Sequence, residues 1–288
     1  MIHAAPSTAP IAERCRVLQV ARSGYYAWCR RPLSARTQDD GVLLQRIRAI
    51  HLETQARYGR VRIHRELRAQ GIRCGQKRVG RLLRSAGLRA EYPRPYRVTT
   101  CGRVSAVAAN RLAQRFAVAA HPRLNQSWTA DLTYLRTGEG WLFLAVILDL
   151  ASRRVVGWAL RPRMDQELTL TALRMAIAQR RLPRRAPRLH HSDRGLQYTS
   201  TAYQAMLKRS GFDPSLSRHG NCYDNAVTES FFATLRKELV HRRPFATRTQ
   251  AQREVIAFIE GWYNRRRRHS ALDFRSPVEY EREVHGER

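Results

Sequence analysis

Residues 128–150 read WTADLTYLRTGEGWLFLAVILDL, and this stretch predicts the centre of a β-sheet. Its first eight residues alternate, so that Thr129, Asp131 and Thr133 face one side of a strand and the residues between them face the other. A Gly-Glu-Gly turn follows, and residues 141–150 are almost wholly apolar, as a buried central strand requires. The stretch therefore predicts two adjacent strands, with one acidic side chain held rigidly on the surface of the sheet.

The chain after this hairpin alternates between strand and helix patterns. Three meandering strands followed by alternating helices and strands predict an α/β fold, in which a mixed sheet is flanked by helices. The further elements are expected, in chain order, as a strand at 155–160, a helix at 165–181, a strand at 188–191, a helix at 200–210, an extended segment at 212–217 and a helix from Asp224 or Asn225 to about residue 239.

The chain before the hairpin predicts a small all-α unit with a basic last helix. Helical spacing indicates helices at 41–54, 60–70 and 76–86, and Gly71 and Gly87 are stop signals. Such a unit is what a helix-turn-helix needs to enter the DNA major groove, although a solvated basic face on a small bundle would have the same pattern. The basic side chains that lie opposite the apolar face of the last helix are Lys77, Arg78, Arg81 and Arg84.

The net charge of the chain indicates what kind of molecule it binds. The chain of 288 residues has a net charge of +30, a pI of about 11.4 and an ordinary hydrophobic content of 43%. Such a field attracts polyanions, of which DNA and RNA are the commonest. Five scattered cysteines without a C-x-x-C pair favour neither a disulfide framework nor zinc ligands. With no apolar run of membrane-spanning length and no signal-peptide pattern, a cytoplasmic, nucleoid-associated protein that contacts no membrane is expected.

Three acids stand out against this basic background. Asp131 lies within a strand, Asp193 follows a short strand, and Glu229 lies in a helix with Arg236 seven residues later on nearly the same face. Three carboxylates in one pocket would repel one another without a cation, and two bound Mg²⁺ ions would relieve that repulsion. The alternative is that all three are surface or capping residues. A zinc site at His190 and His191 is less favoured than simple packing, because no Cys stands at ligand spacing.

Four blocks of the sequence are distinctive: WTADLTY at 128–134, HSDRGLQY at 191–198, NCYDNAVTESFF at 221–232 and YNRRRRHSAL at 263–272. They resemble blocks of bacterial insertion-sequence transposases of the retroviral-integrase superfamily. The similarity runs from about residue 12 to 281, and the chain resembles the second-frame (OrfB) product of the insertion-sequence-three group. Ala130 departs from the Thr that many relatives carry before the first Asp.

The resemblance implies an RNase H-like integrase core with Asp131, Asp193 and Glu229 as the D-D-E ligands of two Mg²⁺ ions, for which Mn²⁺ can substitute. It also implies Mg-dependent phosphodiester cleavage and strand transfer, which is DNA transposition and integration at insertion-sequence ends. The implied partners are the terminal repeats, target DNA, the first-frame (OrfA) product and further copies of the chain on DNA. The DNA-contacting residues expected outside the first unit are Arg236, Lys237, Arg268 and His269.

The expected domains are an N-terminal helical segment at 1–40, a helix-turn-helix-like domain at 41–95, a basic Pro-containing linker at 96–123 and the catalytic core with its basic tail at 124–288. The chain is expected to lack the first-frame helix-turn-helix and zipper that recognise element ends. Two alternatives stay open. One is a non-catalytic DNA-binding regulator of the fused transposase, and the other is an RNase H-like nuclease without strand transfer.

Overall fold

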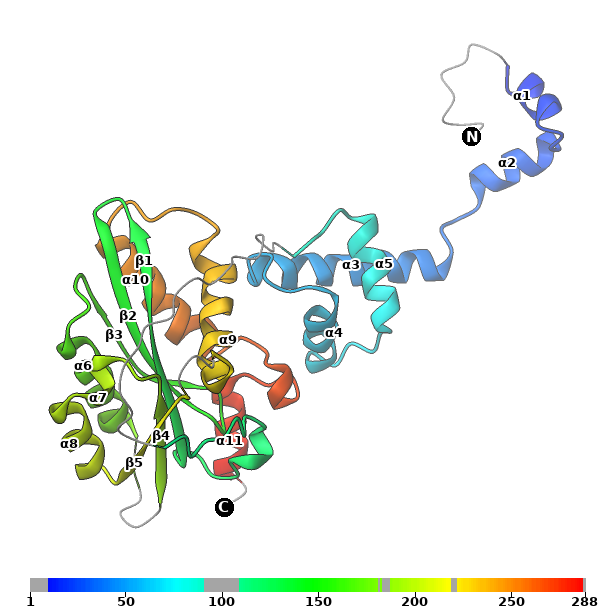
Figure 1. The fold of residues 1–288 in the computed structure, drawn as a ribbon. Coiled ribbons are helices and arrows are strands. Elements are labelled where there is room, and N and C mark those ends of the chain that lie inside the picture. The colour runs from blue at the N-terminus through cyan, green and yellow to red at the C-terminus, as the bar shows by residue number, and fades with distance from the viewer. Residues whose placement is uncertain (1–9, 91–108, 181, 183–186, 219–221, 287–288) are drawn as a thin grey trace. The chain divides into compact units, whose positions relative to one another are not determined.

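The computed structural model describes residues 10–90, 109–180, 182, 187–218 and 222–286. The chain divides into two compact units, Met1–Arg89 and Ala90–Arg288, which are treated separately below (Figure 1). In the described ranges, no helix is both long enough and apolar enough to cross a membrane.

The first unit is helical throughout its described part. Ile47, Leu67 and Val79 are fully buried where the third, fourth and fifth helices pack together, as the helical spacing predicted. In the fourth helix the inward residue is Ile63, whereas Val61, which was expected there, is exposed. The helices are α1 (Ile11–Val17), α2 (Arg22–Arg30), α3 (Ala35–Glu53), α4 (Arg60–Ala69) and α5 (Gln76–Ser85).

Two local features of this unit differ from the sequence-based expectation. The sequence of residues 12–31 predicts a helical segment with a turn at Ser23-Gly24, but these two residues lie inside α2, and the chain turns earlier, at Gln19, which has a φ of 53°. Helix α3 begins at Ala35 and so crosses the boundary expected between residues 40 and 41. Its cap explains the early start, since the Ser34 hydroxyl accepts the backbone N–H of Thr37.

The second unit contains the sheet. Its strands are β1 (Ser127–Thr137), β2 (Gly140–Asp149), β3 (Val155–Arg161), β4 (Arg188–Ser192) and β5 (Phe212–Leu216). Its α-helices are α6 (Gln166–Gln179), α7 (Leu196–Thr199), α8 (Thr201–Arg209), α9 (Ala226–Leu235), α10 (Arg248–Ile256) and α11 (Pro277–Gly286). The shorter turns are the 3-10 segments η1 (Val118–Ala120), η2 (Cys222–Asn225) and η5 (Ser270–Leu272) and the π-helical segments η3 (Arg236–Val240) and η4 (Ala257–Tyr263).

The five strands form one mixed sheet in the order β3-β2-β1-β4-β5. β1, β2 and β3 are antiparallel neighbours, whereas β4 runs parallel to both β1 and β5. The expected mixed sheet flanked by helices is therefore confirmed, and the stretch that opened the sequence analysis forms its two long central strands.

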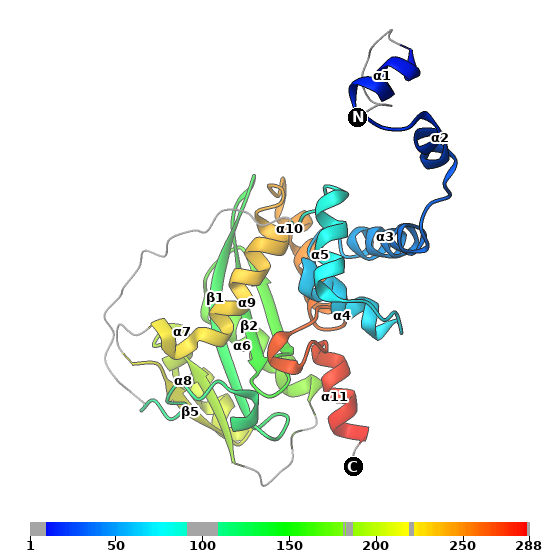
Figure 2. The same cartoon turned by 90° about the vertical axis from the view of Figure 1, so that its right-hand side faces the viewer.

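The alternation predicted for β1 separates two faces of the sheet. Trp128 and Ala130 belong to the apolar core that includes Leu168 and Leu173 of α6 and Leu207 of α8. Thr129 and Thr133 contact the opposite layer, which contains α9. Figures 1 and 2 show α6 to α8 on one side of the sheet and α9 on the other. The face of β1 that carries Asp131 is therefore the face that α9 covers.

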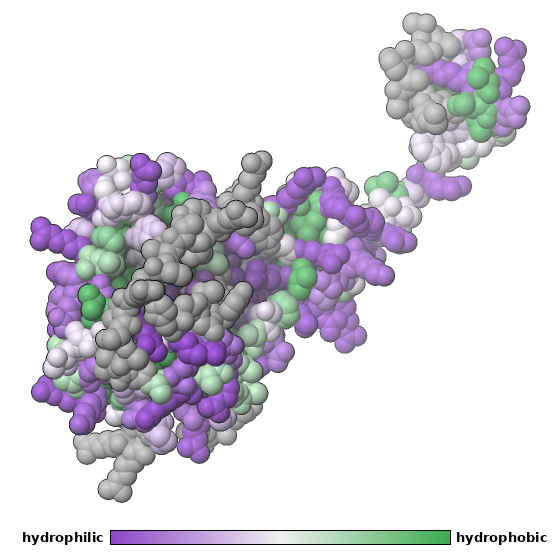
Figure 3. Space-filling view, viewed as in Figure 1, coloured by the Kyte–Doolittle hydropathy of each residue, from purple (hydrophilic) through white to green (hydrophobic). Residues whose placement is uncertain are grey.

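The segment before β1 is part of this unit. Leu112 is buried, and the backbone N–H groups of Arg111 and Leu112 donate to the Ser215 hydroxyl in β5. The linker expected at 96–123 falls outside the described residues up to 108, and its remainder packs on the sheet. In the space-filling view, hydrophilic residues dominate the visible surface of the unit, with only small apolar patches (Figure 3).

Candidate active site

Asp131 lies where two parallel strands of the sheet separate. β1 and β4 pair from Ser127 with Leu189 up to Thr129 with His191. Asp131 and Asp193 each stand two residues beyond that last pair, so both carboxylates come to the same end of the diverging strands. Such strand ends are the usual place for a ligand site in an α/β sheet.

Backbone N–H groups hold both aspartate side chains. Oδ1 of Asp131 accepts the N–H of Leu132 at 2.7 Å, and Oδ1 of Asp193 accepts the N–H of Gly195 at 3.0 Å. A Cβ atom at Gly195 would lie 3.0 Å from the same Asp193 oxygen, closer than side chains normally approach. The glycine is therefore what lets the turn close on the carboxylate.

The helix that carries Glu229 is tied to β1 through a buried polar cluster. Asn225 donates its amide N–H to the carbonyl of Ala130 at 3.1 Å, and its Oδ1 accepts the hydroxyls of Thr129 at 2.5 Å and Thr228 at 3.0 Å. Asn225 is the N-cap residue of α9, but its side chain makes no capping bond. The Asn225 side chain instead bonds β1 just beyond the point where its pairing with β4 ends, one residue before Asp131. This bond sets where the helix begins relative to the strand.

Arg236 ties the other end of α9 to the same strand. Its Nη2 donates to the Thr133 hydroxyl at 3.0 Å, two residues beyond Asp131. The α-helix ends at Leu235, and a π-helical turn begins at Arg236. π-helical turns are rare and are frequent at functional sites. Glu229 thus lies on a helix that is anchored to β1 at both of its ends.

A buried ion pair supports the π-helical turn from behind. The Glu238 carboxylate accepts the indole N–H of Trp262 at 2.8 Å and Nε of Arg267 at 2.9 Å. Glu238, Trp262 and Arg267 are all buried. Arg267 therefore serves the packing of η3 on η4.

The acids influence one another electrostatically. Burial raises the pKa of Asp131 to about 8, the carboxylates of Asp193 and Glu229 raise it as well, and the Leu132 N–H and the Arg236 guanidinium act in the opposite direction. Burial also raises the pKa of Asp193 and, against the effect of Arg236, that of Glu229. The structure therefore brings the three acids and Arg236 into one electrostatic neighbourhood.

The chemistry of these acids suits a divalent cation, but their side chains are not close enough together in this structure to coordinate one. Carboxylate oxygens are the preferred ligands of Mg²⁺, and desolvated acids that repel one another gain from a cation between them. Among the residues that the structure describes, no three acidic, His or Cys side chains are grouped closely enough to hold a metal ion. Glu229 is exposed at the site, so its side chain has room to turn.

Two residues near the acids, Tyr198 and Asn225, were not among the predicted site residues. The Tyr198 hydroxyl is buried without a hydrogen-bond partner in the described structure. Burial raises the pKa of Tyr198, and Tyr203, Asp131 and Asp193 add to that effect. A buried Tyr and Asn normally satisfy their polar atoms, but nothing in their spacing along the chain reveals which strand they meet.

The two adjacent histidines of β4 are packing residues. Nε2 of His190 shares a hydrogen bond with the Tyr203 hydroxyl at 3.0 Å. The two ring nitrogens of His191 share hydrogen bonds with the hydroxyls of Ser215 and Ser217. Burial lowers the pKa of His190 to about 3 and that of His191 to about 4. The interpretation of the pair as packed residues therefore agrees with their place in the core.

In the first unit, the basic residues of α5 are divided between the surface and an ion pair. Lys77 and Arg84 are exposed, whereas Arg78 and Arg81 bind Asp40 of α3 at 2.6 and 2.5 Å. The hydrogen bonds from these arginines lower the pKa of Asp40. Two of the four side chains predicted to contact DNA are thus also used to hold α5 against α3.

The remaining predicted DNA contacts differ in exposure. Lys237 is exposed beside Arg236 in the π-helical turn. Arg268 donates to the carbonyl of Phe274 at 2.8 Å, and His269 is buried against the Tyr263 ring. In this arrangement Arg268 and His269 order the C-terminal turn, and their contact with DNA stays a prediction.

Three family models match the chain. An integrase core domain matches residues 121–222 and a second integrase core domain matches 210–277, so together they span the three acids. An HTH-like domain matches residues 37–96. These ranges agree with the sequence-based division into a helical first unit and an RNase H-like core.

Two curated relatives match nearly the whole chain. Transposase InsF for insertion sequence IS3A of Escherichia coli (strain K12) is 44% identical over 278 residues, covering 94% of this chain and 93% of the relative. A 31 kDa protein of insertion element IS600 from Shigella sonnei is 43% identical over 272 residues, covering 94% and 98%. Among solved structures, a simian T-cell lymphotropic virus intasome has a TM-score of 0.45 and 15% identity, covering 81% of this chain and 73% of that one.

Proposed function

The chain belongs to the family of IS3 insertion-sequence transposases, and from that membership we propose that it cleaves phosphodiester bonds at insertion-sequence ends and transfers the freed strands to target DNA. The single observation that supports this chemistry best is that Asp131 and Asp193 come to the same end of β1 and β4 where these strands separate, with the Glu229 carboxylate near enough to raise the pKa of Asp131. All three acids lie within the ranges that the two integrase core models match.

Asp131, Asp193 and Glu229 would hold the Mg²⁺ ions, for which Mn²⁺ can substitute. When bound, such ions activate the attacking oxygen and stabilise the leaving oxygen of a phosphodiester. Asp131 and Asp193 are already oriented by their backbone hydrogen bonds, and Glu229 completes the set by turning inward from α9. Acids of raised pKa become ligands by losing their protons, so metal binding should strengthen as the pH rises.

The residues around the acids would position the helix and the DNA. Asn225 and Arg236 fix α9 on β1, so the carboxylate of Glu229 can move by rotating its side chain without moving the helix. The exposed Lys237 and the half-buried Arg236 would meet DNA phosphates beside the acids. No covalent enzyme intermediate is required, because phosphoryl transfer needs positioning and charge stabilisation above all.

The proposed partners follow from the family and the charge. The net charge of +30 suits tight, salt-sensitive binding to the terminal repeats and to target DNA. Lys77, Arg78, Arg81 and Arg84 on α5 would contribute to DNA contact from the first unit, with Arg268 and His269 at the C-terminal turn. The first-frame product and further copies of the chain on DNA complete the proposed assembly, which would act on the nucleoid in the cytoplasm.

The test is an incubation of the protein with a DNA duplex that carries the element's own end, with and without the first-frame product, in Mg²⁺. Wild type should release a 3′-hydroxyl and form joined strands, whereas Asp193→Asn should bind the duplex but leave it intact. Asp273→Asn is a matched control, because Asp273 is exposed and left-handed, with a φ of 50° that asparagine tolerates. Metal-dependent cleavage by Asp193→Asn would refute the assignment, and cleavage without joined strands would identify a nuclease.

A non-catalytic regulator of the fused transposase remains the second candidate, because no closed metal cage exists among the described residues. A Mg²⁺ titration separates the two functions. Metal that binds the folded form raises its melting temperature, so the transposase should show a Mg²⁺-dependent shift that Asp131→Asn loses. A regulator should show no such shift in either protein.

A further inference from the structure

A second polar site lies at the other end of the same two strands. A pocket of approximately 280 Å³ is lined by residues from the segment before β1 and from the starts of β4 and β5, among them Arg111, Arg115, Ser127 and Arg188. Ser127 pairs with Leu189 at the start of the parallel ladder, four residues before Asp131. At about 3.3 Å per residue, the pocket lies roughly 13 Å from the acids along β1.

Arg188 is the residue that marks this pocket as a binding site. Its side chain is 95% buried, with a relative exposure of 5%, and its Nη1 donates to the carbonyl of Ser210 at 2.6 Å. Its Nε and Nη2 are buried and have no hydrogen-bond partner in the described structure. Arg188 is one of the residues that line the pocket, and a buried guanidinium normally has its donors satisfied, so its two unpartnered N–H groups make it the candidate to bind an acceptor there.

The charge of the lining selects the kind of acceptor. Arg111, Arg115 and Arg188 carry three positive charges, against one negative charge on Asp213, which pairs with Arg111 at 3.0 Å. His121 is held against the carbonyl of Arg115 at 2.6 Å, and burial lowers its pKa, so it adds no charge near neutral pH. The pocket therefore carries a net charge of +2 and excess donors.

We propose that this pocket binds a phosphate group, and that the phosphate is one of the DNA backbone. The parallel N–H groups of a guanidinium fork match two oxygens of a phosphate, and the exposed Arg111 and Arg115 at the rim can bind its neighbours. The pocket has space for a phosphate with part of an attached sugar. It uses none of the acids of the proposed active site, so DNA would be held at both ends of the β1–β4 ladder.

The test measures phosphate binding in EDTA, where the acid site contributes nothing. Inorganic phosphate replaces chloride at constant ionic strength, and the melting temperature is followed for wild type, for Arg111→Gln with Arg115→Gln, and for Arg188→Lys. Wild type should be stabilised by phosphate, and both variants should lose most of that shift. Arg111 and Arg115 are exposed, so the double variant remains folded even if Arg188→Lys does not.

The matched control is Arg163→Gln with Arg174→Gln. It also removes two exposed arginines, one of them paired with an acid, since Arg174 binds Glu167 as Arg111 binds Asp213. The control should keep the wild-type phosphate shift. An equal loss in the control, or an unchanged shift in the pocket variants, would overturn the proposal by showing that phosphate acts on the overall charge alone.

A second arm, also in EDTA, identifies the source of the phosphate. A short duplex of arbitrary sequence should bind the Arg111→Gln, Arg115→Gln variant about three- to tenfold more weakly than the control, with a salt dependence reduced by about one to two phosphate contacts. Equal duplex affinity, together with a lost phosphate shift, would assign the pocket to a free phosphate ester and refute the DNA source. Because neither arm requires cleavage, the outcome is independent of the proposed transposase chemistry.

Discussion

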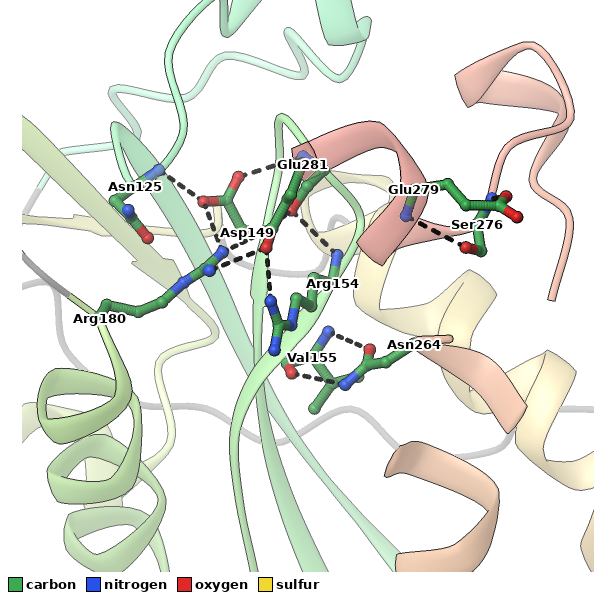
Figure 4. Close-up of polar contacts among 10 residues, drawn as sticks. Asn125, Asp149, Arg154, Val155, Arg180, Asn264, Ser276, Glu279 and Glu281 are labelled. Carbon is green, nitrogen blue, oxygen red and sulfur yellow. Dashed lines mark hydrogen bonds and ion pairs between the residues drawn. The ribbon is translucent and has the colours of Figure 1, made fainter. Parts of the chain in front are cut away.

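The second unit contains two groups of acids that share the same sheet and differ in how they are neutralised. Asp149 and Glu281 are almost completely buried, and Arg180, Arg154 and backbone N–H groups surround them (Figure 4). The Asp149 carboxylate accepts the N–H of Asn125 at 2.6 Å and that of Ala151 at 2.8 Å. Nearly every oxygen in this group has a partner supplied by the chain.

The acids around Asp131 have fewer partners from the chain. The aspartates among them accept one backbone N–H each, and Arg236 is the cation that acts on both Asp131 and Glu229. Burial alone would raise the pKa of Glu281, but Arg180 and Arg154 outweigh it and lower that pKa. Burial raises the pKa of Asp149 against the effects of Arg180 and the Asn125 N–H, and it raises the pKa of Asp131 to about 8. Acids that the protein neutralises by itself hold the fold together, and acids that it leaves under-neutralised are available for a cation from outside.

The largest expected effect is on activity and should be confined to the second group. Asp131→Asn should reduce cleavage of an end-bearing duplex by at least about a thousandfold, a loss of roughly 4 kcal/mol of transition-state stabilisation. In metal-free buffer the same change removes a repelled carboxyl, so its melting temperature should equal or exceed that of wild type. A large loss of stability in EDTA would show that Asp131 is a structural acid like Asp149, and the comparison would fail.

The next effect is on stability and belongs to the first group. Glu281→Ala leaves the buried Arg180 without its main partner, and removal of one member of a buried pair costs about 3 to 5 kcal/mol. Urea denaturation should report that loss. Glu283→Ala on the same helix is the control, because its pair with Arg275 is exposed and is expected to contribute less than about 1 kcal/mol. Similar urea midpoints for the two variants would mean that the buried pair of Glu281 and Arg180 contributes no more to stability than a surface pair.

A smaller effect should link stability and activity at the junction of α9 with β1. Asn225→Ala removes the bond to the Ala130 carbonyl and leaves the hydroxyls of Thr129 and Thr228 to bond each other. We expect a loss of about 1 to 2 kcal/mol in the free energy of unfolding, with a lower rate of cleavage and little change in DNA affinity. Ser230→Ala, at an exposed position of α9, should change neither quantity. Full activity in Asn225→Ala would show that this tie does not position Glu229.

The smallest effect is expected at the hydrogen bond between Arg236 and Thr133. Thr133→Val removes the acceptor of Arg236 while keeping the shape of the side chain, and Arg236 is half-exposed and can turn to water. The free energy of unfolding should fall by about 1 kcal/mol or less. A single-turnover assay should show a severalfold slower cleavage step, because Arg236 would no longer be held beside Asp131. Thr171→Val, which changes a half-buried hydroxyl on α6, is the control for the loss of one such bond.

Much of the architecture could be read from local pattern. The strands expected at 128–135 and 141–150 from alternation and from an apolar run are found as β1 and β2, with ends that differ by one or two residues. Gly71 and Gly87 end their helices in the left-handed conformation, at φ values of 79° and 66°, as stop signals should. Asp131 stood out because a carboxylate is unfavourable in mid-strand unless a function requires it.

Other parts of the chain could not be read in this way. Asn225 was expected as a helix cap, and its side chain instead reaches across to the free edge of β1. In the sequence Asp149 ends a strand and Asp224 precedes a helix, which predicts surface or capping residues, yet both are completely buried among partners distant in sequence. Arg188, which begins a short strand, gave no local sign that it would be buried beside a pocket with two N–H groups unpartnered.

The amino-acid sequence by itself determined the strands, the helices, the basic character and the identity of the three acids, because these depend on periodicity, charge and residue type over short stretches. Only the tertiary structure decided which acids the chain itself neutralises and which it does not. That outcome depends on which arginine, N–H group or hydroxyl from a distant segment arrives within about 3 Å of each carboxylate. The register of β1 on β4 and the placement of α9 determine which groups meet each carboxylate, and no local sequence pattern encodes these contacts.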